Sequence, residues 1–161
     1  MVLDFDAHHG DGTEEILADR PGVRFLSLFQ WPLFPHRRME PTPSNAVLSP
    51  LPAGAGGEDI RNVVENVWLP EIDKFQPDLM ILSAGFDAHC EERIAQLKAG
   101  EMDYACVTRL LVEASFAYCE GRLVSVLEGG YELRSLARSV FTHLQGLIRN
   151  PLPAETCKDP N

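Results

Sequence analysis

The stretch LDFDAHHGDG (residues 3–12) begins as an apolar strand and runs directly into a cluster of carboxylates and imidazoles. Side chains on a strand alternate between its two faces, so Asp4, Asp6 and His8 project to the same side if the extended conformation continues. Two carboxylates and an imidazole directed at one point are a typical ligand set for a metal ion. A solvated strand end is the simpler alternative, because short patterns of this kind often occur without a ligand.

The rest of the chain alternates short β-rich runs with helical patterns, which is typical of an α/β fold with a parallel sheet. We expect the strand at 78–83 to be central and covered on both faces, because it is a nearly continuous apolar run. The segment 30–56 is rich in proline and is expected to be mostly loop, with a short strand near 45–48. The other expected strands are 2–6, 23–28 and 123–127. The first helix is expected to start after Gly12 with Thr13 as its N-cap, and the other expected helices cover 58–75, 103–119 and 133–148.

Length and composition indicate one intracellular domain. The chain has 161 residues, of which 45% are hydrophobic, enough for a single core. Twenty-four acidic against 14 basic side chains give a net charge of −10, which disfavours direct binding to nucleic acid. The four cysteines form no CxxC pair and are expected to be reduced thiols. We find no apolar run long enough for a membrane span, and we expect a cytoplasmic protein, or a nuclear one in a eukaryote.

The unusual polar residues fall at the carboxyl ends of predicted strands, the edge where open α/β sheets bind ligands. Asp87 follows the strand at 78–83, and Glu128-Gly-Gly-Tyr131 follows the strand at 123–127. Mixed Asp and His ligands suit zinc or another first-row divalent ion that activates water and polarises a carbonyl. The phenol of Tyr131 could donate a hydrogen bond to an oxyanion, although a tyrosine that opens a helix is more often a packing residue.

Three motifs, LDFDAHHGDGT, SAGFDAH and LEGGYEL, occur in this order, and together they resemble the zinc-dependent histone deacetylase family. That family includes bacterial acetylpolyamine amidohydrolases and acetoin-utilisation proteins. The resemblance implies the arginase/deacetylase α/β fold and hydrolysis of an acetyl amide. It places the zinc ligands on Asp6, His8 and Asp87, and it places the tyrosine that stabilises the transition state on Tyr131.

The resemblance also implies a monovalent cation, usually potassium, beside the zinc. Its ligands would be Asp4, Asp6 and His8 together with the main-chain oxygens of Ser27 and Leu28. The charge of this cation would tune the zinc ligands and the nearby imidazoles.

The substrate channel of the family corresponds to Phe34 and to the glycine pair Gly129 and Gly130. A core position for Phe34 remains an alternative, because buried aromatic side chains usually only pack. The substrate implied is acetyl-lysine in histones or other proteins, or an acetylpolyamine-like amine.

The resemblance covers what would be the C-terminal half of a catalytic domain, residues 1–149, followed by an expected disordered tail at 150–161. The family's N-terminal half carries a Gly-His-His motif that supplies the general base and its partner. Asp4 and Asp11 match the carboxylates that orient these two histidines. Without that half, the strand after Met1 is expected to lose its neighbours and expose an unpaired edge, so association with the missing half or another chain is a possible requirement.

Two alternatives stay open. The chain could be a catalytically inactive or regulatory half that still binds a metal, because the usual base is absent. It could instead be a ureohydrolase of the same fold, which uses two metal ions. Against this alternative, the sequence lacks a second Asp-x-Asp cluster, because Asp87 is followed by Ala-His-Cys-Glu-Glu.

Overall fold

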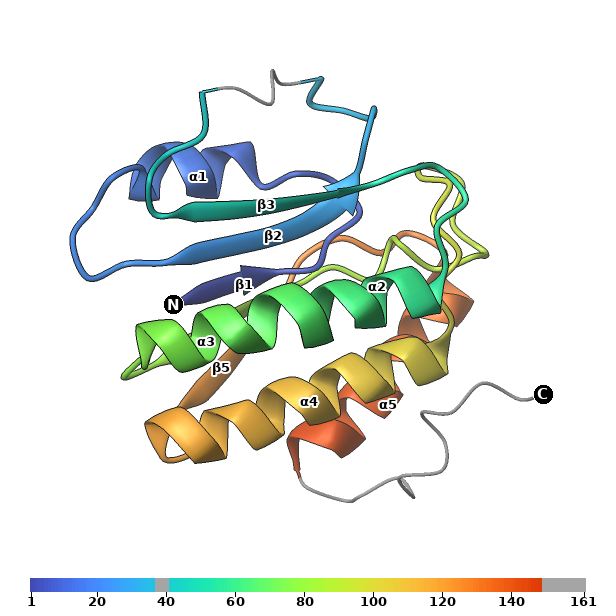
Figure 1. Cartoon of the computed structure of the whole chain (residues 1–161). Helices are drawn as coiled ribbons and strands as arrows, with labels where there is room; N and C mark the ends of the chain where they lie inside the picture. Colours follow the sequence, from blue (N-terminus) through green and yellow to red (C-terminus); the bar gives the residue numbers. More distant parts are fainter. Residues whose placement is uncertain (37–40, 149–161) are drawn as a thin grey trace.

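The computed structural model describes residues 1–36 and 41–148 of the chain. Within them the protein is an α/β domain built on a five-stranded parallel sheet with the order β3-β2-β1-β4-β5 (Figure 1). The predicted tail at 150–161 lies outside the described residues. The strands are β1 (Val2–Asp4), β2 (Phe25–Gln30), β3 (Ala46–Leu51), β4 (Met80–Ala84) and β5 (Leu123–Leu127).

The first strand is central, and the expectation that it forms an exposed edge is wrong. β1 pairs with β2 on one side and with β4 on the other, so that Asp4 lies opposite both Ser27 and Ser83. The crossovers after β1 place the next strands on either side of it. The unpaired edges among the described residues therefore fall on β3 and β5.

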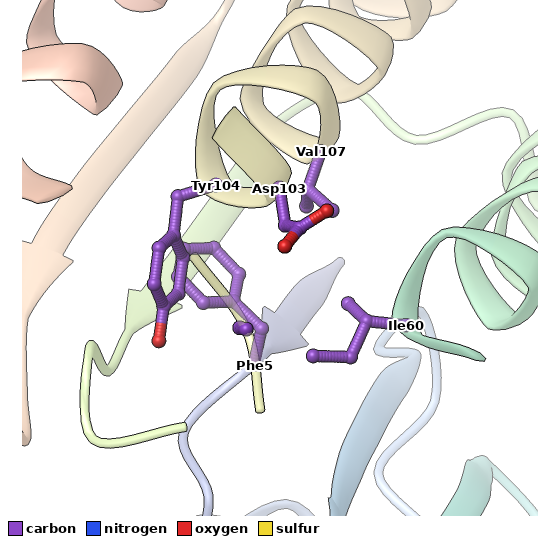
Figure 2. Close-up of a pocket in the computed structure, with 6 residues that line it drawn as sticks. Phe5, Ile60, Asp103, Tyr104 and Val107 are labelled. Carbon is purple, nitrogen blue, oxygen red and sulfur yellow. The ribbon is translucent and has the colours of Figure 1, made fainter. Parts of the chain in front are cut away.

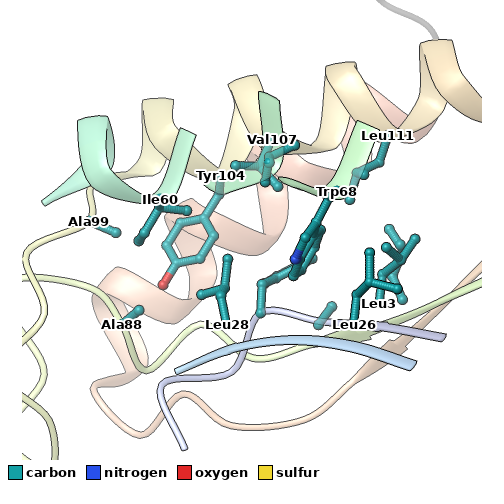
Figure 3. Close-up of a cluster of buried hydrophobic side chains, with 14 of the residues drawn as sticks. Leu3, Leu26, Leu28, Ile60, Trp68, Ala88, Ala99, Tyr104, Val107 and Leu111 are labelled. Atoms are coloured by element: carbon teal, nitrogen blue, oxygen red, sulfur yellow. The ribbon is translucent and has the colours of Figure 1, made fainter. Parts of the chain in front are cut away.

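Most of the helices cover one face of the sheet. A continuous helical segment, which runs through α2 (Gly57–Val63), η1 (Val64–Trp68) and α3 (Leu69–Phe75), lies alongside α4 (Glu101–Cys119) (Figure 1). α5 (Leu133–Leu147) packs on α4. Between these helices and the sheet lies the main core, whose buried members include Leu3, Leu26, Leu28, Trp68, Tyr104 and Leu111 (Figure 3).

The other face of the sheet is covered over β2 by α1 (Asp11–Leu17). Glu14 of α1 hydrogen-bonds the buried His9, Nε2 to Oε2 at 2.7 Å, and the His9 ring packs on Phe29 with centroids 4.5 Å apart. α1 begins at Asp11, two residues before the Thr13 that the sequence predicted as its N-cap. Ile81 and Ser83 on this face are half-buried, so β4 is central but less fully covered than expected.

Two further sequence expectations need correction. The segment 30–56 contains a longer strand than expected, because β3 runs from Ala46 to Leu51 and accommodates Pro50 at the edge of the sheet. Cys90 and Cys119 are free thiols as expected, but Cys106 is disulfide-bonded. Across the described ranges, none of the helices combines the length and apolar character that a membrane crossing requires.

A buried histidine ties three elements together beneath the sheet edge. The Thr108 hydroxyl donates its proton to the Tyr104 carbonyl. The same hydroxyl oxygen must therefore accept the 2.6 Å hydrogen bond that it makes with Nδ1 of His143, which carries the proton. Nε2 of His143 then accepts from the Ser125 hydroxyl at 2.8 Å, so α4, β5 and α5 meet at a neutral imidazole. Burial lowers the pKa of His143 to about 4, which agrees with this assignment.

Because its folded-state pKa lies below the ordinary value of 6.5, His143 should make stability depend on pH. Between pH 4 and pH 6.5 this histidine is protonated in the unfolded chain but neutral in the folded one. The stability that the neutral His143 contributes is therefore complete above pH 6.5 and is lost as the pH falls toward 4. We expect a loss of about 3 kcal/mol over this window. His143→Gln should flatten this slope, measured as the free energy of urea unfolding from pH 4 to 7. An unchanged slope in the variant would contradict the assignment.

Candidate metal centre

Three of the predicted ligands converge immediately beyond the carboxyl ends of β1 and β4. Nδ1 of His8 lies 3.0 Å from Oδ1 of Asp6 and 2.8 Å from Oδ2 of Asp87. The three side chains offer one nitrogen and two carboxylate oxygens within 4.8 Å of one another. The structure therefore brings together the ligand set that the sequence predicted.

Backbone hydrogen bonds hold these carboxylates in place. Asp87 accepts from the N–H of Ala7 at 2.8 Å, and Asp6 accepts from the N–H of His8 at 2.8 Å and of Gly129 at 3.0 Å. The loops after β4 and β5 are joined by a hydrogen bond from the Phe86 N–H to the Gly129 carbonyl at 2.8 Å. The site is thus built from three loops that meet at one edge of the parallel sheet.

The electrostatics of the cluster favour a bound cation. Hydrogen bonds to Asp6 and Asp87 raise the pKa of His8 to about 10, against the smaller opposing effect of burial. The pKa of Asp87 is raised from its usual value, chiefly because this carboxyl is buried. A proton on His8 therefore compensates the two carboxylates when no metal ion is bound, and a divalent cation could replace it. Burial, mixed N and O donors and charge all fit a divalent ion of the zinc type.

Asp4 lies beside the cluster rather than in it. It is buried, and its carboxyl accepts a hydrogen bond from the N–H of Asp6 at 3.1 Å. Burial raises the pKa of Asp4 well above its usual value, against the opposing effect of this hydrogen bond. The Ser83 hydroxyl donates to Glu128 at 3.1 Å on the same side of the site. A surface cavity of about 140 Å³ opens here, lined by Asp4, Asp6, His8, His9, Gly10, Thr13, Ser83 and Glu128.

Two glycines allow the loops to approach the ligands closely. A Cβ atom on Gly129 would lie 2.5 Å from Oδ2 of Asp6 and 2.6 Å from Oδ2 of Asp87. A Cβ on Gly85 would lie 2.5 Å from the backbone Cα of Asp6. Gly129, predicted as a channel residue, therefore packs directly against the carboxylates of Asp6 and Asp87. Gly130 has a φ of +131°, a conformation that favours glycine.

Gly129→Ala should weaken zinc binding by about 10- to 100-fold, because the added methyl group pushes two ligand oxygens out of position. Gly12→Ala is the matched control, since a Cβ there meets nothing within 4 Å. Competition with a zinc chelator measures both affinities. Equal affinities in the two variants would contradict the proposed crowding at Gly129.

Tyr131 stands at the rim of the site, 65% exposed, in the loop between β5 and α5. Glu92 fixes this loop, because its Oε1 accepts from the N–H of Tyr131 at 2.6 Å and of Glu132 at 2.7 Å. The pKa of Tyr131 is raised by partial burial and by the charges of Asp87 and Asp6, so the phenol keeps its proton. No sequence pattern indicates this role of Glu92, which follows Asp87 as one of two adjacent acidic residues, Glu91 and Glu92.

Other predicted residues are not brought to the metal ligands. Asp11 is exposed at the start of α1, where it accepts a hydrogen bond from the N–H of Gly12. Phe34 is 67% exposed, which excludes a core position for it. Ser27 lies beside Asp4 in the sheet, and Leu28 is buried in β2. The roles assigned to these residues in orienting histidines, lining a channel and binding potassium stay predictions.

A second group of possible ligands, His89, Glu91 and Glu101, is better described as an ion-pair network. The guanidinium of Arg138 donates to the carboxylates of both Glu91 and Glu101. Nε2 of His89 lies 3.5 Å from the Glu101 carboxylate. These contacts anchor α5 to the loop after β4 and to α4, and the arginine already forms ion pairs with both carboxylates.

A small internal cavity below the site is lined by Phe5, Ile60, Ala99, Asp103, Tyr104 and Val107 (Figure 2). Its volume is about 10 Å³, room for roughly one water molecule and too little for an acyl group. Within the described part of the chain, the buried Tyr104 hydroxyl has no hydrogen-bond partner.

The fold and this site define a class of protein: an α/β domain in which Asp and His side chains that could hold a metal ion converge at the carboxyl edge of a parallel sheet. Comparison with known proteins identifies the family, because the model of the histone deacetylase domain matches residues 1–147. The chain belongs to the histone deacetylase family of the arginase/deacetylase superfamily.

Individual relatives agree with this assignment. The chain is 38% identical over 138 residues to a probable deacetylase of Archaeoglobus fulgidus, which covers 82% of this chain and 38% of that protein. It is 33% identical over 166 residues to the chloroplastic histone deacetylase 10 of Oryza sativa subsp. japonica, covering 99% of this chain and 38% of the relative. The HD domain of HDA15 superposes with a TM-score of 0.81 at 28% identity, covering 92% of this chain and 45% of that one. The chain therefore spans less than half of the length of these relatives.

Proposed function

We propose that this chain forms the zinc-binding part of a deacetylase that hydrolyses acetyl amides, with acetyl-lysine or an acetylated amine as substrate. The observation that carries the proposal is the convergence of Asp6, His8 and Asp87 at the end of the parallel sheet. These residues would hold the ion. A zinc ion held there supplies a Lewis acid that activates water and polarises a carbonyl.

The residues of this chain have defined tasks in that reaction. Tyr131, protonated at neutral pH, donates a hydrogen bond to the carbonyl oxygen as negative charge develops on it. Glu92 holds the backbone of the tyrosine loop, so that the phenol stays at the rim of the site. Asp6 and Asp87 keep their orientation through backbone N–H groups.

The one pair of tandem histidines in the sequence is His8 and His9. His8 would be a zinc ligand and His9 is hydrogen-bonded to Glu14, so neither is available as the general base. We propose that a general base enters the cavity beside Asp4 from another polypeptide segment. The buried Asp4 carboxylate and the volume of this cavity support a site for an imidazole there. A potassium ion at Asp4, Asp6 and His8, with the main-chain oxygens of Ser27 and Leu28, belongs to the same proposal.

The test is hydrolysis of a fluorogenic acetyl-lysine peptide with added zinc. The purified chain alone should show little turnover, because proton transfer by a positioned base is worth about 10² to 10⁴ in rate. Adding the histidine-bearing part of a related deacetylase should restore turnover, and Asp87→Ala should abolish it. Turnover that survives Asp87→Ala would contradict the proposed function, whereas full activity of the chain alone would require a base within it.

A further inference from the structure

Gln30, the last residue of β2, carries a buried amide among mostly apolar side chains. Only 1% of the residue is exposed, and every residue of β2 (FLSLFQ) is buried. An amide that is removed from water costs free energy unless both its NH₂ group and its carbonyl oxygen find hydrogen-bond partners. A glutamine at this position therefore requires a specific set of contacts.

The side chain of Gln30 pairs with Gln96, in the loop between β4 and α4. Its Oε1 accepts from the main-chain N–H of Gln96 at 2.6 Å, and its Nε2–H donates to Oε1 of Gln96. A main-chain N–H can only donate, so the orientation of the Gln30 amide is fixed by this contact. The carbonyl of Gln96 accepts from the N–H of Gly54 at 2.9 Å. The same loop carries the candidate metal ligand Asp87.

The main chain of Gln30 binds a second loop of the metal centre. Its N–H donates to the carbonyl of Ala7 at 2.9 Å, and the N–H of Ala7 donates to Oδ1 of Asp87 at 2.8 Å. Ala7 is fully buried, and it lies between the candidate ligands Asp6 and His8. Gln30 thus contacts both of the loops that supply the three candidate ligands.

These contacts form a closed circuit around the site. From Gln30 the circuit passes through Ala7 to Asp87, follows the main chain to Gln96, and returns to Gln30 through the paired amides. A carboxylate that binds a metal ion must keep its orientation, so contacts behind the ligands affect metal affinity. Opening the amide pair would loosen the segment that follows Asp87.

We propose that Gln30 is a positioning residue of the metal centre. It holds the loop of Asp6 and His8 through its main chain, and it holds the loop of Asp87 through its side-chain amide. This inference rests on the proposed function, because it concerns the residues that would hold zinc. If Gln30 only packed, an apolar side chain of similar length, such as methionine, would serve equally well at this position.

Two substitutions open the amide pair from opposite sides. Gln30→Met keeps the length of the side chain and removes both hydrogen bonds, whereas Gln96→Ala removes one acceptor at an exposed position where folding should be little affected. Each should weaken zinc binding by about tenfold, measured by competition with a zinc chelator. Gln96→Glu should keep the parental affinity, because its carboxylate still accepts from the Gln30 amide. Asn66→Ala is the matched control, because the Asn66 amide bonds only within its own helical segment.

Hydrogen exchange separates positioning from overall stability. In the metal-free Gln96→Ala chain, the Ala7 amide should exchange about tenfold faster, because its acceptor Asp87 is held less firmly. Exchange at Leu82 in β4, a strand paired on both sides, should stay within about twofold of the parent. Equal acceleration at Ala7 and Leu82 would show a loss of stability alone and would overturn the inference.

The inference would also be overturned by parental zinc affinity in both Gln30→Met and Gln96→Ala, or by the same loss of affinity in Gln96→Glu as in Gln96→Ala. These measurements involve no turnover. A completed enzyme that binds zinc but hydrolyses no acetyl amide would therefore count against the proposed function and not against the role of Gln30. A parent chain that binds no zinc would contradict the proposed function, and exchange at Ala7 would then decide by itself whether Gln30 holds Asp87.

Discussion

Tyr131→Phe is expected to lower turnover of an acetyl-lysine substrate by about 10² or more in the chain completed by its histidine-bearing partner, while zinc stays bound. Phenylalanine keeps the ring and removes the one donor that would meet the developing oxyanion. The phenol is in its donating form, because partial burial and the charges of Asp87 and Asp6 raise its pKa. The side chain is 65% exposed, so its hydroxyl contributes little to folding.

Tyr118→Phe provides the matched control, because Tyr118 lies near the end of α4 and belongs to no part of the site. It should leave both turnover and KM unchanged. In Tyr131→Phe the loss should fall on kcat, with a similar decrease in kcat/KM, as expected for an interaction made in the transition state. Turnover within about twofold of the parent would contradict the assigned role of Tyr131.

The convergence of the three candidate ligands could be predicted from the sequence because their positions follow from local rules. Asp6 and His8 directly follow an apolar strand, and Asp87 follows another, so the parallel sheet alone brings them to a common edge. The family motifs then placed Tyr131. The structure added the distances that join these groups and the backbone N–H groups of Ala7 and Gly129 that hold them.

Contacts between remote segments could not be predicted in this way. Nothing local in Glu92 indicates that it binds the backbone N–H groups of the Tyr131 loop, because this contact depends on how two loops meet. The position of the first strand in the sheet was mispredicted for the same reason, since the length of a crossover does not state on which side the next strand pairs. The sequence predicted an exposed edge at β1, whereas the structure places β1 inside the sheet and the unpaired edges of the described residues at β3 and β5.

Asp87→Asn should abolish zinc binding at micromolar zinc. The amide has the size of the carboxylate and can still accept from the N–H of Ala7, but it lacks the charge that a divalent ion requires of this buried position. We expect the affinity for zinc to fall by about 10² or more. This loss should exceed that of Gly129→Ala, which displaces the carboxylates but removes none of them. Asp11→Asn is the matched control, because Asp11 is exposed and outside the ligand set.

Zinc stoichiometry is the direct test of a metal centre at Asp6, His8 and Asp87. Equilibrium dialysis of the purified chain, of Asp87→Asn and of Asp11→Asn, followed by metal analysis, measures bound zinc without reference to any substrate. We expect about one zinc ion per chain in the parent and in Asp11→Asn, and none in Asp87→Asn. Absence of zinc from the parent, or the same zinc content in Asp87→Asn, would contradict it.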